Sequence, residues 1–220
     1  GVAVTIVVPQ TTAAAVREAI AARGARVLVH GSVWDESHEH ATVLARTQGA
    51  VYVHPFDDPL LWDGHATLID EVVRAGATFD AVVTSVGGGG LLAGIVEGLR
   101  RNGLAQVPVI AVETKGAASF AAALAAGEPV TLPAITSIAT SLGARRVMPR
   151  LLDLSREHEI VSLVVSDAQA VAACGRFADA MRVLVEPACG APLAAPDAHP
   201  AVFERFRAPL FKTFDRAGGG

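Results

Sequence analysis

Lysine and cysteine are both scarce in this sequence. Of its 220 residues only Lys115 and Lys212 are lysines, although Lys and Arg together number 18. The two cysteines, Cys174 and Cys189, are too few for a disulfide framework, and neither belongs to a CxxC pair of the kind that binds zinc. These absences exclude a disulfide-stabilised secreted scaffold and a cysteine-based zinc site, and we expect a cytoplasmic protein.

The sequence also lacks a broad excess of positive charge and a long hydrophobic run. Its formal net charge is −4, and its basic residues form no cluster larger than pairs such as Arg145-Arg146, which does not favour binding to nucleic acid. Runs without a charged residue, such as 81–96 and 116–127, are rich in glycine or too short to cross about 30 Å of hydrocarbon. With 51% hydrophobic residues, we predict a soluble globular protein that binds neither nucleic acid nor a membrane.

Strand-like and helix-like segments alternate along the chain. Runs of apolar and β-branched residues favour strands, and apolar residues at helical spacing favour helices. This alternation predicts an α/β fold with open, twisted, mostly parallel sheets flanked by helices, in which ligands bind at the carboxyl ends of strands. The predicted strands are residues 2–8, 26–31, 50–56, 79–86, 107–114 and 159–166, and the predicted helices are residues 12–22, 35–48, 60–76, 91–103, 117–126 and 168–177, the last capped by Asp167.

Four consecutive glycines, Gly87 to Gly90, stand between a predicted strand and a predicted helix. The first turn of a helix presents N–H groups without intrahelical acceptors and about half a positive charge, so it attracts anions such as phosphate. Each glycine destabilises regular structure by roughly 0.5 to 1 kcal/mol relative to alanine. We therefore interpret the glycines as a phosphate-binding turn and not as a packing feature.

Two known phosphate-binding motifs match this turn incompletely. The Walker loop requires Gly-Lys followed by Ser or Thr, whereas Leu91 and Leu92 follow the glycines here. In the dinucleotide motif GxGxxG, Gly87 and Gly89 occupy the first two positions, and Leu92 stands at the third. Glu113, at the end of the next predicted strand, stands where an acid that binds ribose is expected. The P-loop is therefore excluded, and binding of a nicotinamide dinucleotide stays open.

Five longer segments narrow the choice. In order along the chain they are FDDPLLWDGHATLIDEV (56–72), SVGGGGLLAGIVEGL (85–99), VPVIAVETKGAASFAAAL (107–124), LPAITSIATSLGA (132–144) and LVEPACGAPLA (184–194). Together these segments resemble the serine dehydratase branch of the serine/threonine ammonia-lyases, which are pyridoxal-phosphate enzymes of the tryptophan-synthase-β type. The likeness covers about residues 2–195.

The resemblance implies a two-domain pyridoxal-phosphate enzyme of fold type II, of which this chain would be incomplete at both ends. Residues 1–55 would be the remainder of a small α/β domain. Residues 56–195 would be the large α/β domain that binds the phosphate of the cofactor. Residues 196–220 would be a divergent tail, in which Pro196 and Pro200 interrupt any helix.

The resemblance also implies two sets of binding residues. The backbone N–H groups of the glycine turn would bind the phosphate of pyridoxal 5′-phosphate, and a cation, K+ or Mg2+, would lie beside it. Oxygen ligands suit such hard ions. The phosphate-binding residues would be Gly87, Gly88, Gly89, Gly90 and Leu91, and the cation ligands would be the side chain of Glu113 with the carbonyl oxygens of Ala117, Leu142 and Ala144.

By the same resemblance, the reaction is a β-elimination of amino-acid metabolism, catalysed by a homodimer. L-serine or L-threonine would lose water by β-elimination, and the resulting aminoacrylate-type product would be hydrolysed to ammonia and pyruvate or 2-oxobutanoate. In the family, the lysine that forms the Schiff base lies upstream of the segment that matches residues 2–9. We therefore expect no catalytic lysine in this chain, since Lys115 follows the cation ligand and Lys212 lies in the tail.

Two other functions stay open. The expected absence of the lysine is also compatible with a catalytically dead subunit that binds a phosphate ligand or an active homologue. The glycine spacing is compatible with an NAD-binding oxidoreductase domain.

The remaining candidate residues have structural interpretations. His54 and His65 lack His or Cys residues at metal-binding spacing, and Asp57-Asp58 is interpreted as a turn. We expect Glu186–Gly190 to form a loop near the cofactor, in which Cys189 packs without acting as a nucleophile.

Overall fold

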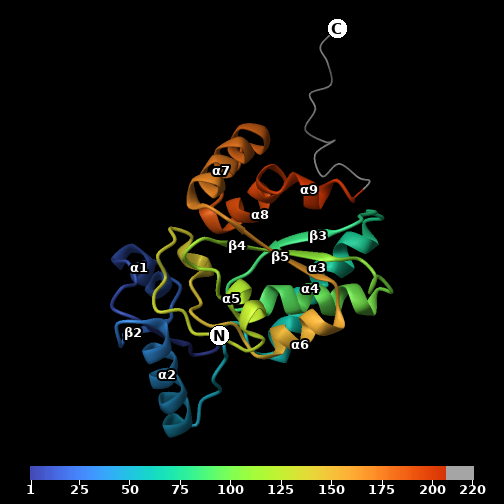
Figure 1. Cartoon of the computed structure of the whole chain (residues 1–220). Coiled ribbons are helices and arrows are strands. Elements are labelled where there is room, and N and C mark those ends of the chain that lie inside the picture. Colours follow the sequence, from blue (N-terminus) through green and yellow to red (C-terminus); the bar gives the residue numbers. More distant parts are fainter. Residues whose placement is uncertain (207–220) are drawn as a thin grey trace. The chain divides into compact units, whose positions relative to one another are not determined.

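The computed structural model describes residues 1–206 of the chain (Figure 1). The chain divides into two compact units, Gly1–His54 and the part that begins at Pro55. Each unit contains its own sheet, and all strand pairs in both sheets are parallel. This confirms the predicted parallel α/β fold.

The first unit is a two-stranded sheet with two helices. Strand β1 pairs with β2 from Thr5 opposite Arg26 to Val8 opposite Val29. Helix α2 ends at Gly49, whose φ of 64° lies in the left-handed region that favours glycine. The bounds are β1 Thr5–Val8, α1 Ala14–Ala22, β2 Arg26–Val29 and α2 Trp34–Gln48.

The predicted strand at residues 50–56 is wrong, because these residues form no strand. Tyr52 packs on helix α2 instead, with its hydroxyl 2.6 Å from Nδ1 of His38. Val51 and Val53, which point the other way, are 89% and 60% exposed. A strand needs a neighbouring strand for its backbone hydrogen bonds. Within the described residues no strand pairs with this segment.

The second unit is built on a three-stranded sheet in the order β3-β4-β5. Val82 of β3 lies opposite Val109 of β4, which in turn lies opposite Ile160 of β5. The central strand β4 is buried along its whole length, as expected for a strand covered on both faces. The bounds are β3 Val82–Ser85, β4 Val109–Thr114 and β5 Ile160–Val165.

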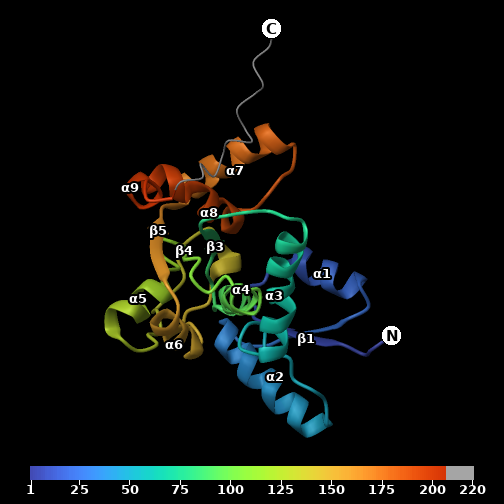
Figure 2. The same ribbon diagram turned by 90° about the vertical axis from the view of Figure 1, so that its right-hand side faces the viewer.

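Helices cover both faces of this sheet (Figures 1 and 2). On one face, α4, α5 and α6 bury Leu92, Phe120 and Leu151 completely. On the other face, α7 and α8 form a core of small residues such as Ala191 and Ala195. The bounds are α3 Pro59–Arg74, α4 Gly90–Arg101, α5 Ser119–Ala126, the 3-10 turn η1 Thr140–Leu142, α6 Arg150–Glu157, α7 Asp167–Met181, α8 Pro187–Ala198 and α9 Pro200–Phe203.

Helix α3 packs against a row of glycines on α4. A Cβ atom added to Gly94 would lie 2.4 Å from the Cβ atom of His65, and one added to Gly98 would lie 2.7 Å from the carbonyl oxygen of Ala66. The helices therefore approach more closely than larger side chains would permit. Helix α3 is capped by Asp58, whose side chain accepts the N–H of Leu60 at 2.9 Å, in agreement with the predicted turn.

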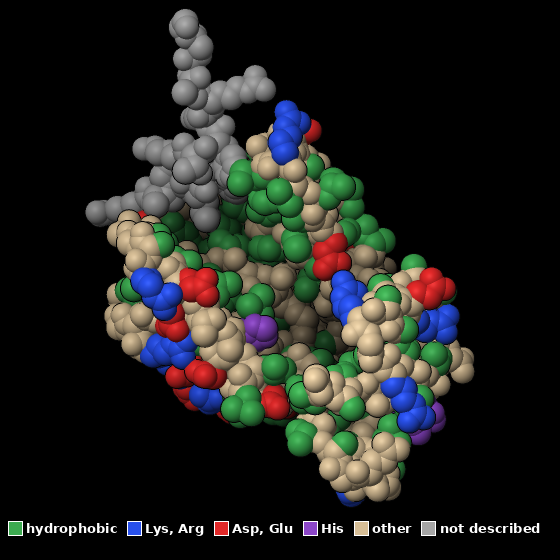
Figure 3. Space-filling model, turned by 180° about the vertical axis from the view of Figure 1, so that it is seen from behind, with side chains coloured by type: hydrophobic (Ala, Val, Ile, Leu, Met, Phe, Trp, Pro, Cys, Tyr) green, Lys and Arg blue, Asp and Glu red, His purple; other side chains and the backbone are tan. Residues whose placement is uncertain are grey.

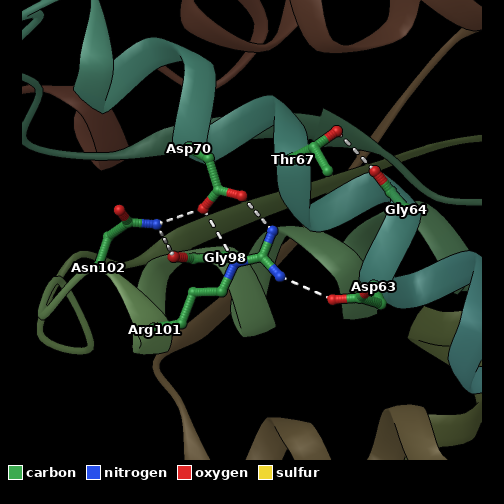
Figure 4. Close-up of polar contacts among 7 residues, drawn as sticks. All are labelled: Asp63, Gly64, Thr67, Asp70, Gly98, Arg101 and Asn102. Carbon is green, nitrogen blue, oxygen red and sulfur yellow. Dashed lines mark hydrogen bonds and ion pairs between the residues drawn. The ribbon is translucent and has the colours of Figure 1, made fainter.

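A polar network joins the same two helices (Figure 4). Arg101 donates from Nε to Asp70 at 2.9 Å and from Nη1 to Asp63 at 2.7 Å, and Asn102 donates to Asp70 at 2.7 Å. The hydrogen bond from Arg101 holds the pKa of Asp70 below its usual value. Because these side chains are partly exposed, the network adds little stability.

Helices α6 and α7 differ from prediction. Helix α6, with Leu151 and Leu154 buried, lies in a section where no helix was predicted. Helix α7 is capped by Ser166 and not by Asp167. The Ser166 hydroxyl accepts the N–H of Gln169, and the Gln169 side chain accepts the N–H of Ser166. This capping box leaves the Asp167 side chain available for another contact.

Helix α8 also differs from prediction. The loop expected at Glu186–Gly190 is the start of this helix, since Pro187 suits the first helical turn, and Cys189 is exposed instead of packed. The helix continues through Pro196, so the expectation that this proline interrupts it is wrong. Pro200 begins the short helix α9. The predicted tail beyond residue 206 lies outside the described residues.

Charged side chains of both signs share the surface. On the face drawn in Figure 3, Lys and Arg side chains lie among Asp and Glu side chains and form no broad positive area. Among residues 1–206, no helix combines the length and the apolar character that crossing a membrane requires.

Candidate functional site

The glycine turn lies at the carboxyl edge of the three-stranded sheet, where ligands bind in open α/β folds. Strand β3 ends at Ser85 and β4 at Thr114. Ser85 lies opposite Val112, and the N–H of Val86 donates to the carbonyl oxygen of Val112 at 2.9 Å. The turn is therefore next to Glu113 across the two strands.

The turn presents a series of N–H groups. Gly89 is the N-cap of α4 and has a φ of 107°, a conformation largely restricted to glycine. The N–H of Ala93 donates to the carbonyl oxygen of Gly89 at 2.9 Å. Across the described part of the chain, the N–H groups of residues 87–92 donate to no protein acceptor. They are the donors that a helix N-terminus offers to a phosphate.

The glycines are also required for packing, which corrects the interpretation made from the sequence. A Cβ atom on Gly87 would lie 3.2 Å from the Cα atom of Leu142, and one on Gly88 would overlap the ring of Phe56 at 2.3 Å. A Cβ atom on Gly90 would lie 2.7 Å from the carbonyl oxygen of Phe56. Close approach of neighbouring segments and exposure of backbone donors therefore both demand glycine here.

Glu113 is completely buried at the end of β4. Its Oε1 accepts the N–H of Phe120 and its Oε2 the N–H of Ala121, each at 2.8 Å. These bonds cap α5 and favour the ionised carboxylate, but burial outweighs them and raises the pKa of Glu113 to about 7. Near neutral pH this carboxyl group therefore exchanges between its charged and neutral forms.

The orientation of Glu113 does not support the nicotinamide alternative. An acid that binds ribose must face the cofactor, whereas both oxygens of Glu113 face the N-terminus of α5. Its side chain has no exposed area, so it does not lie at the surface where the ribose of a dinucleotide would bind.

Ser119 is a candidate that the sequence analysis missed. It is the first residue of α5, it has no exposed area, and its hydroxyl oxygen has no hydrogen-bond partner within residues 1–206. A buried hydroxyl without a partner is costly, so this oxygen fits a site that receives a ligand. The available signal was a hydroxyl residue two positions after Ala117, at the start of a predicted helix.

The other predicted cation ligands lie on two segments. Ala117 is buried just before α5, and its N–H donates to the carbonyl oxygen of Thr114 at 2.9 Å. Leu142 lies in η1 against Gly87, and the N–H of Ala144 donates to the carbonyl oxygen of Leu142 at 2.9 Å. Within residues 1–206, no group of three or more His, Cys, Asp or Glu side chains is placed to hold a metal ion. A cation here would depend on backbone carbonyl oxygens.

Neither lysine lies inside this arrangement. Lys115 follows β4 and its side chain is exposed, and Lys212 lies outside the described residues. The two predicted sets of binding residues do meet at one point, because Gly87 of the phosphate-binding set contacts Leu142 of the cation-binding set.

Comparisons with known proteins point to a single family. The model of the family described as pyridoxal-phosphate dependent enzyme matches residues 1–204, which extends past residue 195, where we expected the likeness to end. A mouse protein named serine dehydratase-like is 52% identical over 196 residues, covering 89% of this chain and 60% of its own length. Human L-serine dehydratase/L-threonine deaminase is 51% identical over 201 residues, covering 90% of this chain and 61% of its own length.

A solved structure has the same fold. The L-serine ammonia-lyase of the fungus Rhizomucor miehei superposes with a TM-score of 0.82 at 37% identity, covering 93% of this chain and 65% of that protein. This chain thus spans about three fifths of the length of the curated relatives cited above. The match to the family model over residues 1–204 shows that the chain belongs to the pyridoxal-phosphate dependent enzymes. Its parallel α/β fold and its glycine turn agree with this family.

Proposed function

We propose that this chain carries the phosphate-binding part of an L-serine/L-threonine ammonia-lyase. The observation that supports this most directly is the row of N–H donors at residues 87–92, next to β4. The names of the mouse, human and fungal relatives support the choice of amino-acid substrate. In the proposed reaction serine or threonine loses water by β-elimination, and hydrolysis of the resulting enamine takes up one water and releases ammonia, which leaves pyruvate or 2-oxobutanoate.

In this proposal the chain binds the cofactor by its phosphate. The N–H groups of the four glycines and Leu91 donate to the phosphate oxygens, and the dipole of α4 favours the negative charge. Bound pyridoxal phosphate supplies an electron sink for the carbanion formed at the substrate α-carbon. The protein residues described here hold and orient that group.

We further infer the domain roles. Gly1–His54 would be part of the small domain, and the unit that begins at Pro55 would be the large, phosphate-binding domain. The residues after 204, which the family model does not match, would form a divergent end. Two compact units, each with its own parallel sheet, support this division.

The phosphate site is tested with a ligand that cannot form a Schiff base. Pyridoxine 5′-phosphate is titrated into the protein by calorimetry, with Leu91→Pro compared with Leu91→Ala. Both variants remove the leucine side chain, but only proline removes the N–H. Loss of one hydrogen bond to a charged group costs about 1.5 to 3 kcal/mol, so proline should weaken binding at least about tenfold relative to alanine. Equal binding by both variants would contradict the proposed site.

The reaction is tested with pyridoxal phosphate and L-serine or L-threonine, on the longest form of the protein that its gene encodes. Keto acid and ammonia should appear in equal amounts. Borohydride reduction followed by peptide mass spectrometry identifies any lysine that holds the cofactor. A protein that binds pyridoxine 5′-phosphate but releases no keto acid would instead be a catalytically dead phosphate-binding subunit, which is the second candidate function.

We also propose a cation site, for K+ or Mg2+, formed by Glu113, Ser119 and the carbonyl oxygens of Ala117, Leu142 and Ala144. The buried hydroxyl of Ser119 and the buried carboxyl of Glu113 support it. A cation competes with the proton on Glu113. Since the pKa of Glu113 is about 7, added K+ should raise Tm more at pH 8 than at pH 5.

The control for this experiment is N-methylglucamine chloride at equal ionic strength, and MgCl2 distinguishes the two ions. Glu113→Gln should remove the difference between the two pH values. An equal rise in Tm at both values in the unmodified protein would overturn the cation proposal.

The proposed function also includes the cellular location and the oligomeric state of the protein. We propose a cytoplasmic homodimer, in which apolar side chains such as Leu184, 91% exposed, and Val183, 53% exposed, are covered by the partner subunit. Light scattering after size exclusion should give twice the chain mass of 22.6 kDa, and Leu184→Asp should shift the protein toward monomer.

A further inference from the structure

The loop from Leu132 to Arg145 carries two of the proposed cation ligands, Leu142 and Ala144. Its two ends are joined, because the N–H of Leu132 donates to the carbonyl oxygen of Arg145 and Nε of Arg145 donates to the carbonyl oxygen of Leu132, each at 2.8 Å. Apart from η1 the loop has no regular secondary structure. The position of Leu142 therefore depends on contacts of the loop with its surroundings, which are the backbone hydrogen bond from the N–H of Thr136 to the carbonyl oxygen of Gly116 at 3.0 Å and contacts of the loop side chains.

Ser137 is the center of one such set of contacts. Its side chain is 94% buried, and its hydroxyl oxygen lies 2.7 Å from Oγ1 of Thr114, 2.6 Å from Oδ1 of Asp167 and 3.0 Å from the N–H of Ala139. The second oxygen of Asp167 accepts the N–H of Ile138 at 3.1 Å. One side chain thus links the loop to the ends of β4 and β5.

The chemistry of these groups sets the direction of each hydrogen bond. An ionised carboxylate only accepts, so the Ser137 hydroxyl donates to Asp167. Its two acceptor positions then receive the N–H of Ala139 and the hydroxyl hydrogen of Thr114. Every hydrogen-bonding position of Ser137 is used, and Asp167 uses one oxygen for Ser137 and the other for Ile138. The arrangement tolerates no other orientation of the Ser137 hydroxyl while Asp167 is ionised.

Two further features allow Asp167 and the loop to adopt these positions. Ser166 and Gln169 already cap α7, so Asp167, in the first turn, is not needed for capping. Gly116 has a φ of 92°, and a Cβ atom there would lie 2.3 Å from Oγ1 of Thr136. The loop therefore approaches the backbone after β4 too closely for any residue but glycine.

We propose that Ser137 and Asp167 are positioning residues that hold the loop so that the backbone of Leu142 lies against Gly87. They act through the loop and contact neither cofactor nor substrate. The inference rests on the proposed function, because Gly87 and Leu142 are parts of the proposed phosphate and cation sites. The proposal thus gives Asp167, which follows β5, a role in that site.

The test compares Asp167→Asn with a matched control, Asp153→Asn. Ser137 and Ile138 donate to different oxygens of Asp167, and in asparagine one of these oxygens is replaced by an NH2 group, which only donates, so one of the two contacts is lost. Asp153 also lies in the first turn of a helix, α6, but it is exposed, and its ion pair within residues 1–206 is with Arg156 of the same helix at 3.2 Å. Both changes remove one negative charge from a helix N-terminus, so their difference isolates the contact with the loop.

Hydrogen exchange measured by mass spectrometry provides the first readout. Asp167→Asn should speed exchange at least about tenfold in peptides that cover residues 133–145, and should leave peptides from α4 and α5 unchanged. Asp153→Asn should leave residues 133–145 unchanged. Equal exchange of the loop in the two variants overturns the proposal, and so does faster exchange throughout the protein, which would indicate general destabilisation.

Binding of pyridoxine 5′-phosphate provides the second readout. Asp167→Asn should raise Kd about five- to tenfold, and Asp153→Asn should not change it. Ser137→Ala should raise Kd similarly, and the double variant should be no weaker than either single variant, because the two residues act through one contact. Additive effects in the double variant overturn the assignment.

The two readouts separate this inference from the proposed function. If the unmodified protein fails to bind pyridoxine 5′-phosphate, the phosphate site is wrong, while hydrogen exchange still tests whether Asp167 holds the loop. If binding is normal and the Asp167→Asn loop exchanges at the original rate, the positioning role alone is wrong.

Discussion

Two opposed effects act on the ionisation of the buried Glu113 side chain. Burial favours its neutral form, and the two N–H groups of α5 favour its charged form. A residue balanced in this way responds to pH and to any nearby cation. Its structural role as the cap of α5 and its proposed role as a ligand use the same two oxygens.

Replacing Glu113 with glutamine should alter the pH dependence of stability. The folded-state pKa, about 7, lies above the usual value of 4.5, so between these values the folded protein binds more protons than the unfolded chain. The contribution of Glu113 to the free energy of unfolding is therefore present at low pH and is lost as the pH rises through about 7, by up to about 3 kcal/mol. Urea unfolding from pH 5 to pH 8, without added K+, measures this decline.

Glu113→Gln should show a smaller decline over the same pH range. His158 contributes in the opposite sense, because burial lowers its pKa, and it is present in both proteins, so the difference between them isolates Glu113. Identical pH profiles would show that Glu113 does not titrate in this range.

At the scale of elements, the contact of α3 with α4 depends on which glycines face the neighbouring helix. Gly94 and Gly98 lie against α3, whereas a Cβ atom on Gly64 of α3 would meet no atom within 4 Å. We therefore expect replacement of glycine by alanine to have opposite effects on stability at two positions in one pair of helices.

Gly98→Ala should destabilise the protein by about 1 to 3 kcal/mol, because the new Cβ atom would lie 2.7 Å from the carbonyl oxygen of Ala66. Gly64→Ala, the control, should stabilise it by up to about 1 kcal/mol, since alanine has the higher helix propensity and meets no neighbour. Chemical unfolding of the two variants should give changes of opposite sign. A stabilising Gly98→Ala would contradict the observed packing.

The polar network on the same helices should respond to salt. Asp70→Asn removes the charge that Arg101 contacts and should lower Tm slightly at low ionic strength. The decrease should shrink at 1 M NaCl, because salt screens charges at the surface. A decrease that is unchanged by salt would show that the lost interaction is not electrostatic. Calorimetric scans at the two salt concentrations measure the effect.

At the scale of the whole molecule, the chain is two compact units joined near residue 54. Residues 50–58 between α2 and α3 form neither helix nor strand, and Val51 and Val53 are exposed. Each unit has its own sheet, so neither depends on a shared strand for its backbone hydrogen bonds.

Limited digestion with thermolysin, which cleaves before apolar residues, should cut first near Val51 or Val53. Exposed segments without backbone hydrogen bonds are the preferred sites of proteolysis. Among residues 1–206, mass spectrometry should detect early fragments that end or begin between residues 50 and 54. A first cut within α2 or within α3 would show that these helices open more readily than the connection.

The sequence by itself determined most of the secondary structure and the place of the phosphate-binding turn. Apolar runs separated by amphipathic segments predict parallel strands and covering helices, and a strand followed by Gly87–Gly90 and a helix predicts exposed N–H donors. These features depend on neighbours along the chain, which are visible in the sequence. The same local reasoning failed for residues 50–56, because a strand also needs a partner that is distant in the sequence.

Only the tertiary structure decided which groups meet. It places Phe56 on Gly88, Leu142 against Gly87 and Asp167 on Ser137. It also shows that Glu113 caps α5 and that the Ser119 hydroxyl is buried without a partner in the described part of the chain. Sequence reasoning could not find these contacts, because they join residues that are brought together by the packing of strands and helices and not by their spacing along the chain.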